Sequence, residues 1–330
     1  MSVAGGRLEL HFPLHSYGRA AEMEKAMSND DRDARVDELF RDQHGHVSRA
    51  QAIAAGLSKQ QIDYRLRTGQ WTRVLPSTYR LTAAAESWEG SLIVTCLHTN
   101  GVASHRCAAA LWDLILYDEP PVEITVSKTT RSTHDARLHQ STQWHLRDQT
   151  TRRGVPCTGI ERTLLDCAAV VSFSRFERLC EDAIRREYTS WEELALSLRR
   201  HSRQGRNGCG PMRKLLAFRL EDQTIPLSDF SRLIVQLLVE NGVPKPLIEY
   251  RITDDLGALI LQTDLAWPSE RKAWELDGLK FHSGRLAMER DKRKRNRAKA
   301  HGWSIQEILW SMYTDAPDEL VRMAHAFLRS

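Results

Sequence analysis

Apolar residues recur at helical spacing in the segment DARVDELFRDQHG, where Val36, Leu39 and Phe40 share one face. The segments SRAQAIAAG and SKQQIDYRLRTG each begin with a serine, a good N-cap, and stop at a glycine. In the next segment, WTRVLPSTYRL, apolar and polar residues alternate on both sides of a Pro-Ser pair, which indicates a β-hairpin. Three helices followed by a hairpin predict a winged helix-turn-helix over residues 33–85.

The pattern beyond the hairpin changes twice, and the chain is predicted to be a multi-domain α/β protein. Residues 86–170 mix helical segments with strands at VEITVS and QWHLR, which predicts a mixed α/β region. Residues 171–226 read as a helical connector. From 227 to 330, a helix, three strands, a basic helix, a strand and a closing helix predict a second α/β domain with a mixed sheet. Residues 1–32 lack periodicity, which predicts a mobile tail. The alternative is that the true translation start lies further along the chain.

Length and composition narrow the class of protein. A chain of 330 residues predicts two or three domains, and it contains no apolar run of the roughly 18 residues that a membrane helix needs. No signal-peptide pattern is present, so we expect a cytoplasmic protein. The six cysteines form no C-x-x-C pair, which predicts reduced, buried thiols. The net charge is only +4, but the segment from Arg285 to Lys299 contains eight Lys/Arg and two acidic residues. This local excess of positive charge suits phosphate binding.

In a winged helix the second helix of the motif enters the major groove of duplex DNA. The exposed residues expected there are Lys59, Gln60, Gln61, Asp63, Tyr64, Arg65 and Arg67. Arg73 and Arg80 on the hairpin are expected to meet phosphates or the minor groove. The alternative is a small helical domain with an ordinary solvated basic face.

The order HGHVSRAQAIAAGLSKQQIDYRLRTGQWTRVLPSTYRL, then SHRCAAALWDL, then GVPCTGIERTLLDCA, resembles the AbiEi-type antitoxin family. The resemblance covers roughly residues 33–170. It implies an N-terminal winged helix that binds DNA, a toxin–antitoxin or phage-defence setting, and a cognate toxin protein as a possible partner.

Three carboxylates gather in the segments LILQTDLAW and KAWELDG, which the turn signal PSER joins. A four-residue loop pairs Trp267 with Lys272 and places Asp264 opposite Glu275, while Asp277 points to the same face. Like charges so placed destabilise a sheet, so either one pKa is raised or a divalent cation neutralises them. Oxygen ligands suit Mg²⁺ or Mn²⁺, and the basic run nearby suits phosphodiester hydrolysis. This is a predicted metal site.

The same segments, TDLAWPSERKAWELDGLKFH and MERDKRKRNRAKAHGWSIQEILW, resemble the DUF559 family, relatives of very-short-patch repair endonucleases in the PD-(D/E)XK superfamily. The resemblance implies that Asp264, Glu275 and Asp277 are metal ligands or their neighbours and that His282 is catalytic. Arg290, Arg293 and Arg297 are expected to contact DNA. The superfamily's lysine is replaced by Asp277. Three functions stay open: a metal-dependent endonuclease, a non-catalytic DNA-binding antitoxin or transcriptional regulator with a degenerate nuclease fold, and an RNA-directed nuclease.

Overall fold

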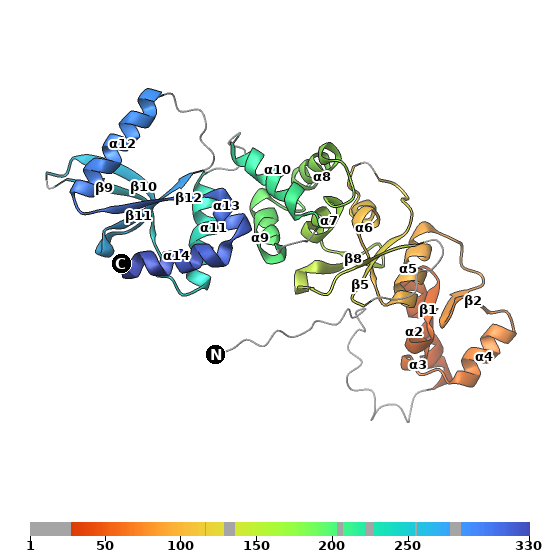
Figure 1. The fold of residues 1–330 in the computed structure, drawn as a ribbon. Coiled ribbons are helices and arrows are strands. Elements are labelled where there is room, and N and C mark those ends of the chain that lie inside the picture. Colours follow the sequence, from red (N-terminus) through yellow and green to blue (C-terminus); the bar gives the residue numbers. More distant parts are fainter. Residues whose placement is uncertain are drawn as a thin grey trace. The chain divides into compact units, whose positions relative to one another are not determined.

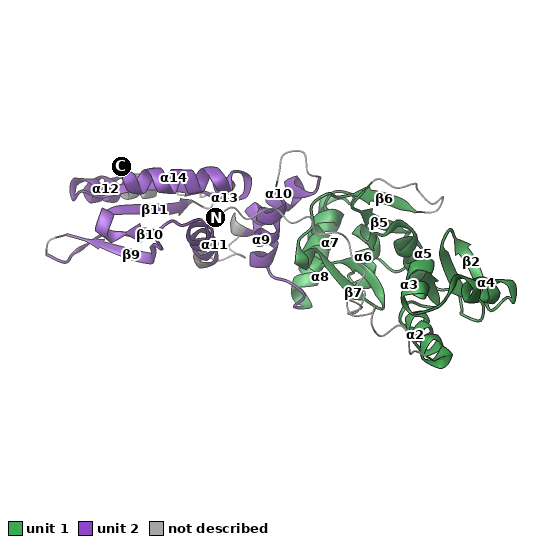
Figure 2. Cartoon of the chain, turned by 90° about the horizontal axis from the view of Figure 1, so that it is seen from below, with its two compact units in different colours: residues 1–186 green, residues 187–330 purple. Residues whose placement is uncertain are grey.

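The computed structural model divides the chain into two compact units, Met1–Arg186 and Glu187–Ser330 (Figure 2). The residues it describes are 28–115, 117–128, 136–202, 207–221, 227–254, 256–277 and 285–330; the side chains at 220–221, 227–228, 277 and 285–291 are excepted. These residues form a mixed α/β fold with three sheets, two of which combine parallel and antiparallel pairs (Figure 1). The predicted fold class is confirmed.

The first sheet and three helices form a winged helix. Its elements are α2 (Asn29–Asp42), β1 (His46–Ser48), α3 (Arg49–Ala54), α4 (Lys59–Arg67), β2 (Trp71–Leu75) and β3 (Thr78–Leu81). The strands are ordered β1-β3-β2 and all pair antiparallel. The predicted helices and hairpin are confirmed, and the three-residue strand β1 is an addition that closes the sheet against α2.

Capping residues decide where these helices begin. Ser48 and Ser58 each form a capping box with the glutamine three residues on, so that both side chains satisfy backbone N–H groups. Ser28 does the same with Asp31 and starts α2 at Asn29. The helix therefore begins inside the predicted tail of residues 1–32, and the remainder of that tail lies outside the described residues.

Aromatic packing holds the winged helix together. Phe40 of α2 meets Trp71 of β2 edge to face at 5.1 Å, and Trp71 lies 5.9 Å from Tyr79 of β3. Val47 and Ile62 are completely buried in the same cluster. The apolar faces predicted from the sequence therefore meet in one core, which fixes α4 with its opposite face turned to solvent.

The second part of the first unit is built on a five-stranded sheet of order β6-β5-β4-β8-β7. Its elements are α5 (Trp88–Thr99), β4 (Val102–Ala103), α6 (His105–Leu111), β5 (Glu123–Val126), β6 (Arg137–Gln140), η1 (Leu146–Asp148), β7 (Gln149–Arg152), β8 (Val155–Thr158), α7 (Ile160–Cys167) and α8 (Phe173–Arg185). Three cysteine side chains lie in its core, packed between the sheet and the helices α5 and α6. All six cysteines of the chain are buried, and none forms a disulfide, as predicted.

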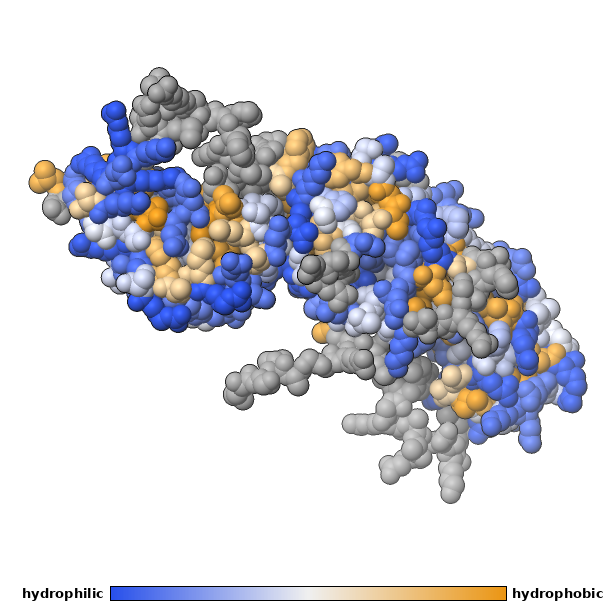
Figure 3. All heavy atoms as spheres, in the orientation of Figure 1, coloured by the Kyte–Doolittle hydropathy of each residue, from blue (hydrophilic) through white to orange (hydrophobic). Residues whose placement is uncertain are grey.

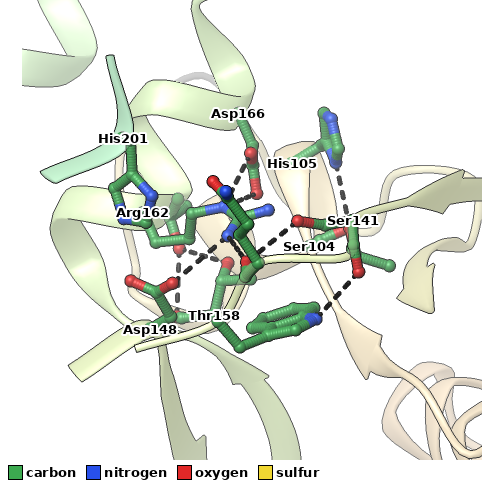
Figure 4. A network of polar contacts seen from close by, with 12 residues as sticks. Ser104, His105, Ser141, Asp148, Thr158, Arg162, Asp166 and His201 are labelled. Carbon is green, nitrogen blue, oxygen red and sulfur yellow. Dashed lines mark hydrogen bonds and ion pairs between the residues drawn. The ribbon is translucent and has the colours of Figure 1, made fainter. Parts of the chain in front are cut away.

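The prediction of a strand at QWHLR is wrong. The segment ends in η1, where the Asp148 carboxylate accepts a hydrogen bond from the His145 N–H at 2.9 Å. The buried guanidinium of Arg162 contacts Asp148 at 3.3 Å and both carboxylate oxygens of Asp166 at 2.9 and 3.0 Å (Figure 4). It also lies 4.8 Å over the Trp144 ring. The polar groups of this segment are thus satisfied by a distant arginine instead of a strand partner.

The second unit carries a mixed sheet of order β12-β11-β10-β9. Its elements are α9 (Trp191–His201), α10 (Cys209–Glu221), α11 (Leu227–Glu240), β9 (Leu247–Thr253), β10 (Leu259–Trp267), η2 (Pro268–Glu270), β11 (Lys272–Asp277), α12 (Arg285–Ala300), β12 (Ser304–Leu309), α13 (Trp310–Asp315) and α14 (Pro317–Arg329). Within this sheet, β11 and β12 pair parallel, whereas the β9–β10 and β10–β11 pairs are antiparallel. The unit boundary falls inside the predicted connector of residues 171–226, because α8 packs on α7 whereas α9 packs on α10 and α13.

Within the described residues, every helix is too short or too polar to traverse a lipid bilayer.

Candidate functional site

Helix α4 presents a polar surface at one end of the first unit, on which Lys59 and Arg67 are basic and Asp63 pairs with Arg49 of α3 at 3.3 Å. It has the position of the recognition helix in a winged helix, after α3 and before the hairpin β2–β3. Tyr64 is 52% exposed, and the Arg67 guanidinium lies 6.0 Å over its ring. The predicted DNA-contacting side chains that are exposed are Lys59, Gln60, Tyr64, Arg67 and, on β2, Arg73.

Two side chains of α4 that were predicted to contact DNA instead contact other parts of the protein. Arg65 forms an ion pair with Asp33 of α2, and its guanidinium lies 5.7 Å over the Trp71 ring. Gln61 accepts a hydrogen bond from the Ser58 N–H at 2.8 Å as part of the helix cap. These two side chains position α4. The spacing along the helix gave no sign of the role of Arg65, because Asp33 and Trp71 lie outside α4, whereas the spacing of Ser58 and Gln61 is that of a capping box.

Three acidic residues lie side by side on adjacent strands of the second unit. The pairs Trp267↔Lys272 and Leu265↔Trp274 confirm the predicted register of the β10–β11 hairpin, and one further step aligns Asp264 with Glu275. On the other side Glu275 pairs with Glu307 of β12. Paired residues share a face of a sheet, so these acids form a row across β10, β11 and β12.

An arginine of α12 meets this row. Arg295 forms ion pairs with Glu275 and with Glu307. The Asp264 carboxylate accepts a hydrogen bond from the Leu276 N–H at 2.7 Å. The repulsion expected between neighbouring carboxylates is therefore relieved by a guanidinium from within the chain, and Glu307 is an acid of the row that the sequence did not single out.

The remaining predicted site residues are only partly described. His282 lies outside the described residues. Asp277 ends β11 and Arg290 lies in α12, but their side chains also fall outside the description. The described residues contain no group of three or more His, Cys, Asp or Glu side chains arranged to hold a metal ion. Arg297 is exposed and pairs with Asp254 at 2.7 Å.

The C-terminal half of α12 is a hydrophilic surface (Figure 3). Lys292, Arg293, Lys294 and Lys299 are exposed there, and no ion pair within the described residues includes them. On its inner side Ala298 is buried in a small apolar cluster with Ile260 of β10. The helix thus turns free positive charge to solvent on the same side of the sheet as the acidic row.

A second cluster of buried charges, in the first unit, was not predicted. Glu123 of β5 is 1% exposed and receives hydrogen bonds from Arg106 at 2.9 and 2.6 Å and from His139 at 3.4 Å. Burial would raise the pKa of Glu123, but the bonds from Arg106 and His139 hold it well below its usual range. His105 stacks on His139 at 3.5 Å, and the Ser104 hydroxyl lies 2.9 Å from its Nδ1. These groups satisfy one another, so the cluster stabilises the sheet.

The order of strands and helices defines a winged-helix domain in the first part of the chain. A comparison with known protein families agrees with this assignment. Residues 34–82 match the family described as "Transcriptional regulator, AbiEi antitoxin". That match supports the predicted resemblance over the winged helix and connects it to DNA-binding regulators.

Two further comparisons give relatives without a described function. The uncharacterized proteins Rv2248 and MT2308, from two strains of Mycobacterium tuberculosis, are each 24% identical over 262 residues, spanning 77% of this chain and 90% of theirs. The crystal structure of the RV2827C protein from Mycobacterium tuberculosis is 17% identical, covers 58% of this chain and 76% of its own, and has a TM-score of 0.34. The resemblance of residues 227–330 to nucleases stays a prediction.

Proposed function

We propose that the chain binds duplex DNA through its winged helix and acts as a regulator, with a toxin protein as a possible second partner. The observation that carries this proposal is the exposed basic face of α4, mounted on a winged-helix topology. Lys59 and Arg67 have no acidic partner among the described residues, so their charges are available to phosphates or base edges. The family matched by residues 34–82 supports the regulatory role.

The test of this proposal is the salt dependence of binding to a duplex of mixed sequence. Lys59→Ala and Arg67→Ala are each expected to reduce the slope of log affinity against log salt by about 1, because each removes one phosphate contact. Fluorescence anisotropy across a salt series measures the slope. Arg178→Ala, an exposed arginine of α8 outside the winged helix, is the matched control and should leave the slope unchanged. Wild-type slopes in all three variants would exclude α4 as the interface.

Arg65→Ala is expected to act differently from its neighbours on α4. Losing the contacts with Asp33 and Trp71 should lower the free energy of unfolding of the winged helix by about 1–2 kcal/mol. Thermal unfolding followed by circular dichroism measures this effect. A variant that keeps full stability yet loses DNA affinity would show that Arg65 contacts DNA and that the internal pair is incidental.

A second function is favoured by the acidic row: metal-dependent endonuclease activity in the second unit, with Mg²⁺ or Mn²⁺ as the cofactor. Asp264 and Glu275 supply hard oxygen ligands on adjacent strands, beside free positive charge on α12. Such an ion would supply an activated water and charge stabilisation for phosphodiester hydrolysis. The described residues fit an ion only when Arg295 leaves Glu275, because the guanidinium already occupies that carboxylate.

Arg295→Ala is therefore expected to increase the affinity for Mn²⁺, measured by calorimetry on the whole chain. Arg293→Ala, a neighbouring arginine that is exposed, is the control and should change little. In plasmid cleavage with Mg²⁺ or Mn²⁺, Asp264→Ala and Glu275→Ala should lose on the order of a hundredfold or more in rate. Equal cleavage by wild type and both variants would reject these ligands. No cleavage by any preparation that still binds DNA would favour the non-catalytic regulator.

A further inference from the structure

A cavity of about 390 Å³ opens in the first unit between the wing strands β2 and β3 and the helix α5, which contacts both strands. Its volume lies in the range of sites for small organic molecules. Val74 and Leu75 of β2, Val94 of α5 and Val122 form apolar walls. Polar groups gather at other points of the lining, so the cavity has an apolar part and a polar part.

Arg80 is the cation of the polar part. Its Nε is buried and has no hydrogen-bond partner within the described residues, and its Nη1 pairs with Glu86. The Glu86 side chain is 85% exposed, and an exposed ion pair of this kind contributes little to stability because water screens it. An incoming anion can therefore take the place of Glu86 on Arg80, and it would find a second donor, Nε, that Glu86 does not use.

The N-terminus of α5 adds positive potential to the same part. Ser87 caps this twelve-residue helix by accepting a hydrogen bond from the Gly90 N–H at 3.0 Å. Ser87 and Ser91 both line the cavity. A helix start favours negative charge through its unpaired N–H groups and its dipole.

His46 adds a buried imidazole to the polar part of the lining. The residue is 4% exposed, lines the cavity, and its Nδ1 is buried without a hydrogen-bond partner in the described structure. Burial lowers the pKa of His46, which keeps the imidazole neutral and able to donate or accept one hydrogen bond there. A Cβ at Gly90 would lie 2.9 Å from the ring, so glycine is what allows the ring this position.

We propose that this cavity binds a small carboxylic acid with an apolar body. The carboxylate takes the two donors of Arg80 and the helix start, and the apolar body lies against the four aliphatic side chains. A neutral amide of the same shape makes the same apolar contacts but has no negative charge. A difference in affinity between the acid and the amide therefore distinguishes the proposed carboxylate site from a site for any apolar molecule. The proposal can be tested without DNA.

Calorimetric titration of the whole chain with benzoate, and with benzamide as the neutral isostere, tests the proposal. Benzoate is expected to bind with a dissociation constant on the order of millimolar or tighter, and benzamide at least about tenfold more weakly. Hexanoate and hexanamide repeat the comparison with an aliphatic body. Equal binding of acid and amide, or saturable binding of neither, would overturn the proposal.

Variants locate the site. Arg80→Gln should weaken benzoate binding at least about tenfold, whereas Arg73→Gln, an exposed arginine on the neighbouring strand, should leave it unchanged. Glu86→Gln removes the internal competitor from an exposed position and should tighten binding, which keeps the test open even if Arg80→Gln unfolds. Val94→Phe fills the apolar part and should abolish binding. Unchanged affinity in both Glu86→Gln and Val94→Phe would place any benzoate site elsewhere.

Discussion

Replacing Arg162 by methionine is expected to lower the free energy of unfolding of the first unit by about 3–5 kcal/mol, because it removes the guanidinium that contacts two buried carboxylates. Arg162 is 3% exposed, and Asp148 and Asp166 are 3% and 8% exposed. The same change removes the guanidinium from the Trp144 ring. Urea unfolding followed by circular dichroism measures the loss.

The control for this effect is Arg178→Met, an exposed arginine on α8, which should change stability by less than about 0.5 kcal/mol. A triple variant that adds Asp148→Asn and Asp166→Asn to Arg162→Met removes the stranded charges and should recover part of the stability. If Arg162→Met alone were as stable as the control, the three charged groups would not form the buried network drawn in Figure 4.

Acidification is expected to destabilise the first unit well before its carboxylates titrate. Burial lowers the pKa of His105 to about 4 from its ordinary value near 6.5, with His139 and Arg162 acting in the same direction and Asp166 and Glu123 against it. Between these two pH values the unfolded chain binds the proton and the folded chain does not. Stability is therefore complete above about pH 6.5 and falls by on the order of 3 kcal/mol as the pH drops to about 4.

His105→Asn isolates this contribution. Asparagine does not titrate, and it tolerates the left-handed backbone that His105 adopts at φ +52°. The slope of unfolding free energy against pH between about 5 and 6.5 should decrease in His105→Asn. His46, whose pKa burial also lowers, accounts for part of the slope that remains. An identical slope in wild type and His105→Asn would mean that His105 is protonated in the folded state.

Most of the fold was predictable because its signals are local. N-cap serines, terminal glycines and the Pro-Ser turn act within a few residues, and they defined the winged helix and most helix starts. Five strands escaped prediction: β1, β4, β6, β7 and β8. The two shortest escaped for the opposite reason: β1 has three residues and β4, Val102–Ala103, has two. Segments that short show no periodicity, and only their pairing partners, more than 20 residues away in sequence, make them strands.

The register of the candidate site was predictable, but the arginine that contacts its carboxylates was not. The loop length alone placed Asp264 opposite Glu275, since a hairpin loop sets the pairing of its strands. The choice between a divalent ion and an arginine depends on how α12 packs on the sheet, which no local pattern encodes. Arg295 stood in the basic run as one of several phosphate-binding charges, and only the fold turns it toward Glu275 and Glu307.

The six buried thiols can report transient unfolding of the chain, because they react only when they are exposed. Burial raises the pKa of Cys107 and of Cys157 to about 12, so neither forms the thiolate that alkylating reagents need. Five of the cysteines belong to the first unit and Cys209 alone to the second. Mass spectrometry of alkylated peptides would therefore time the transient unfolding of each unit separately within one sample, with no probe introduced by mutation.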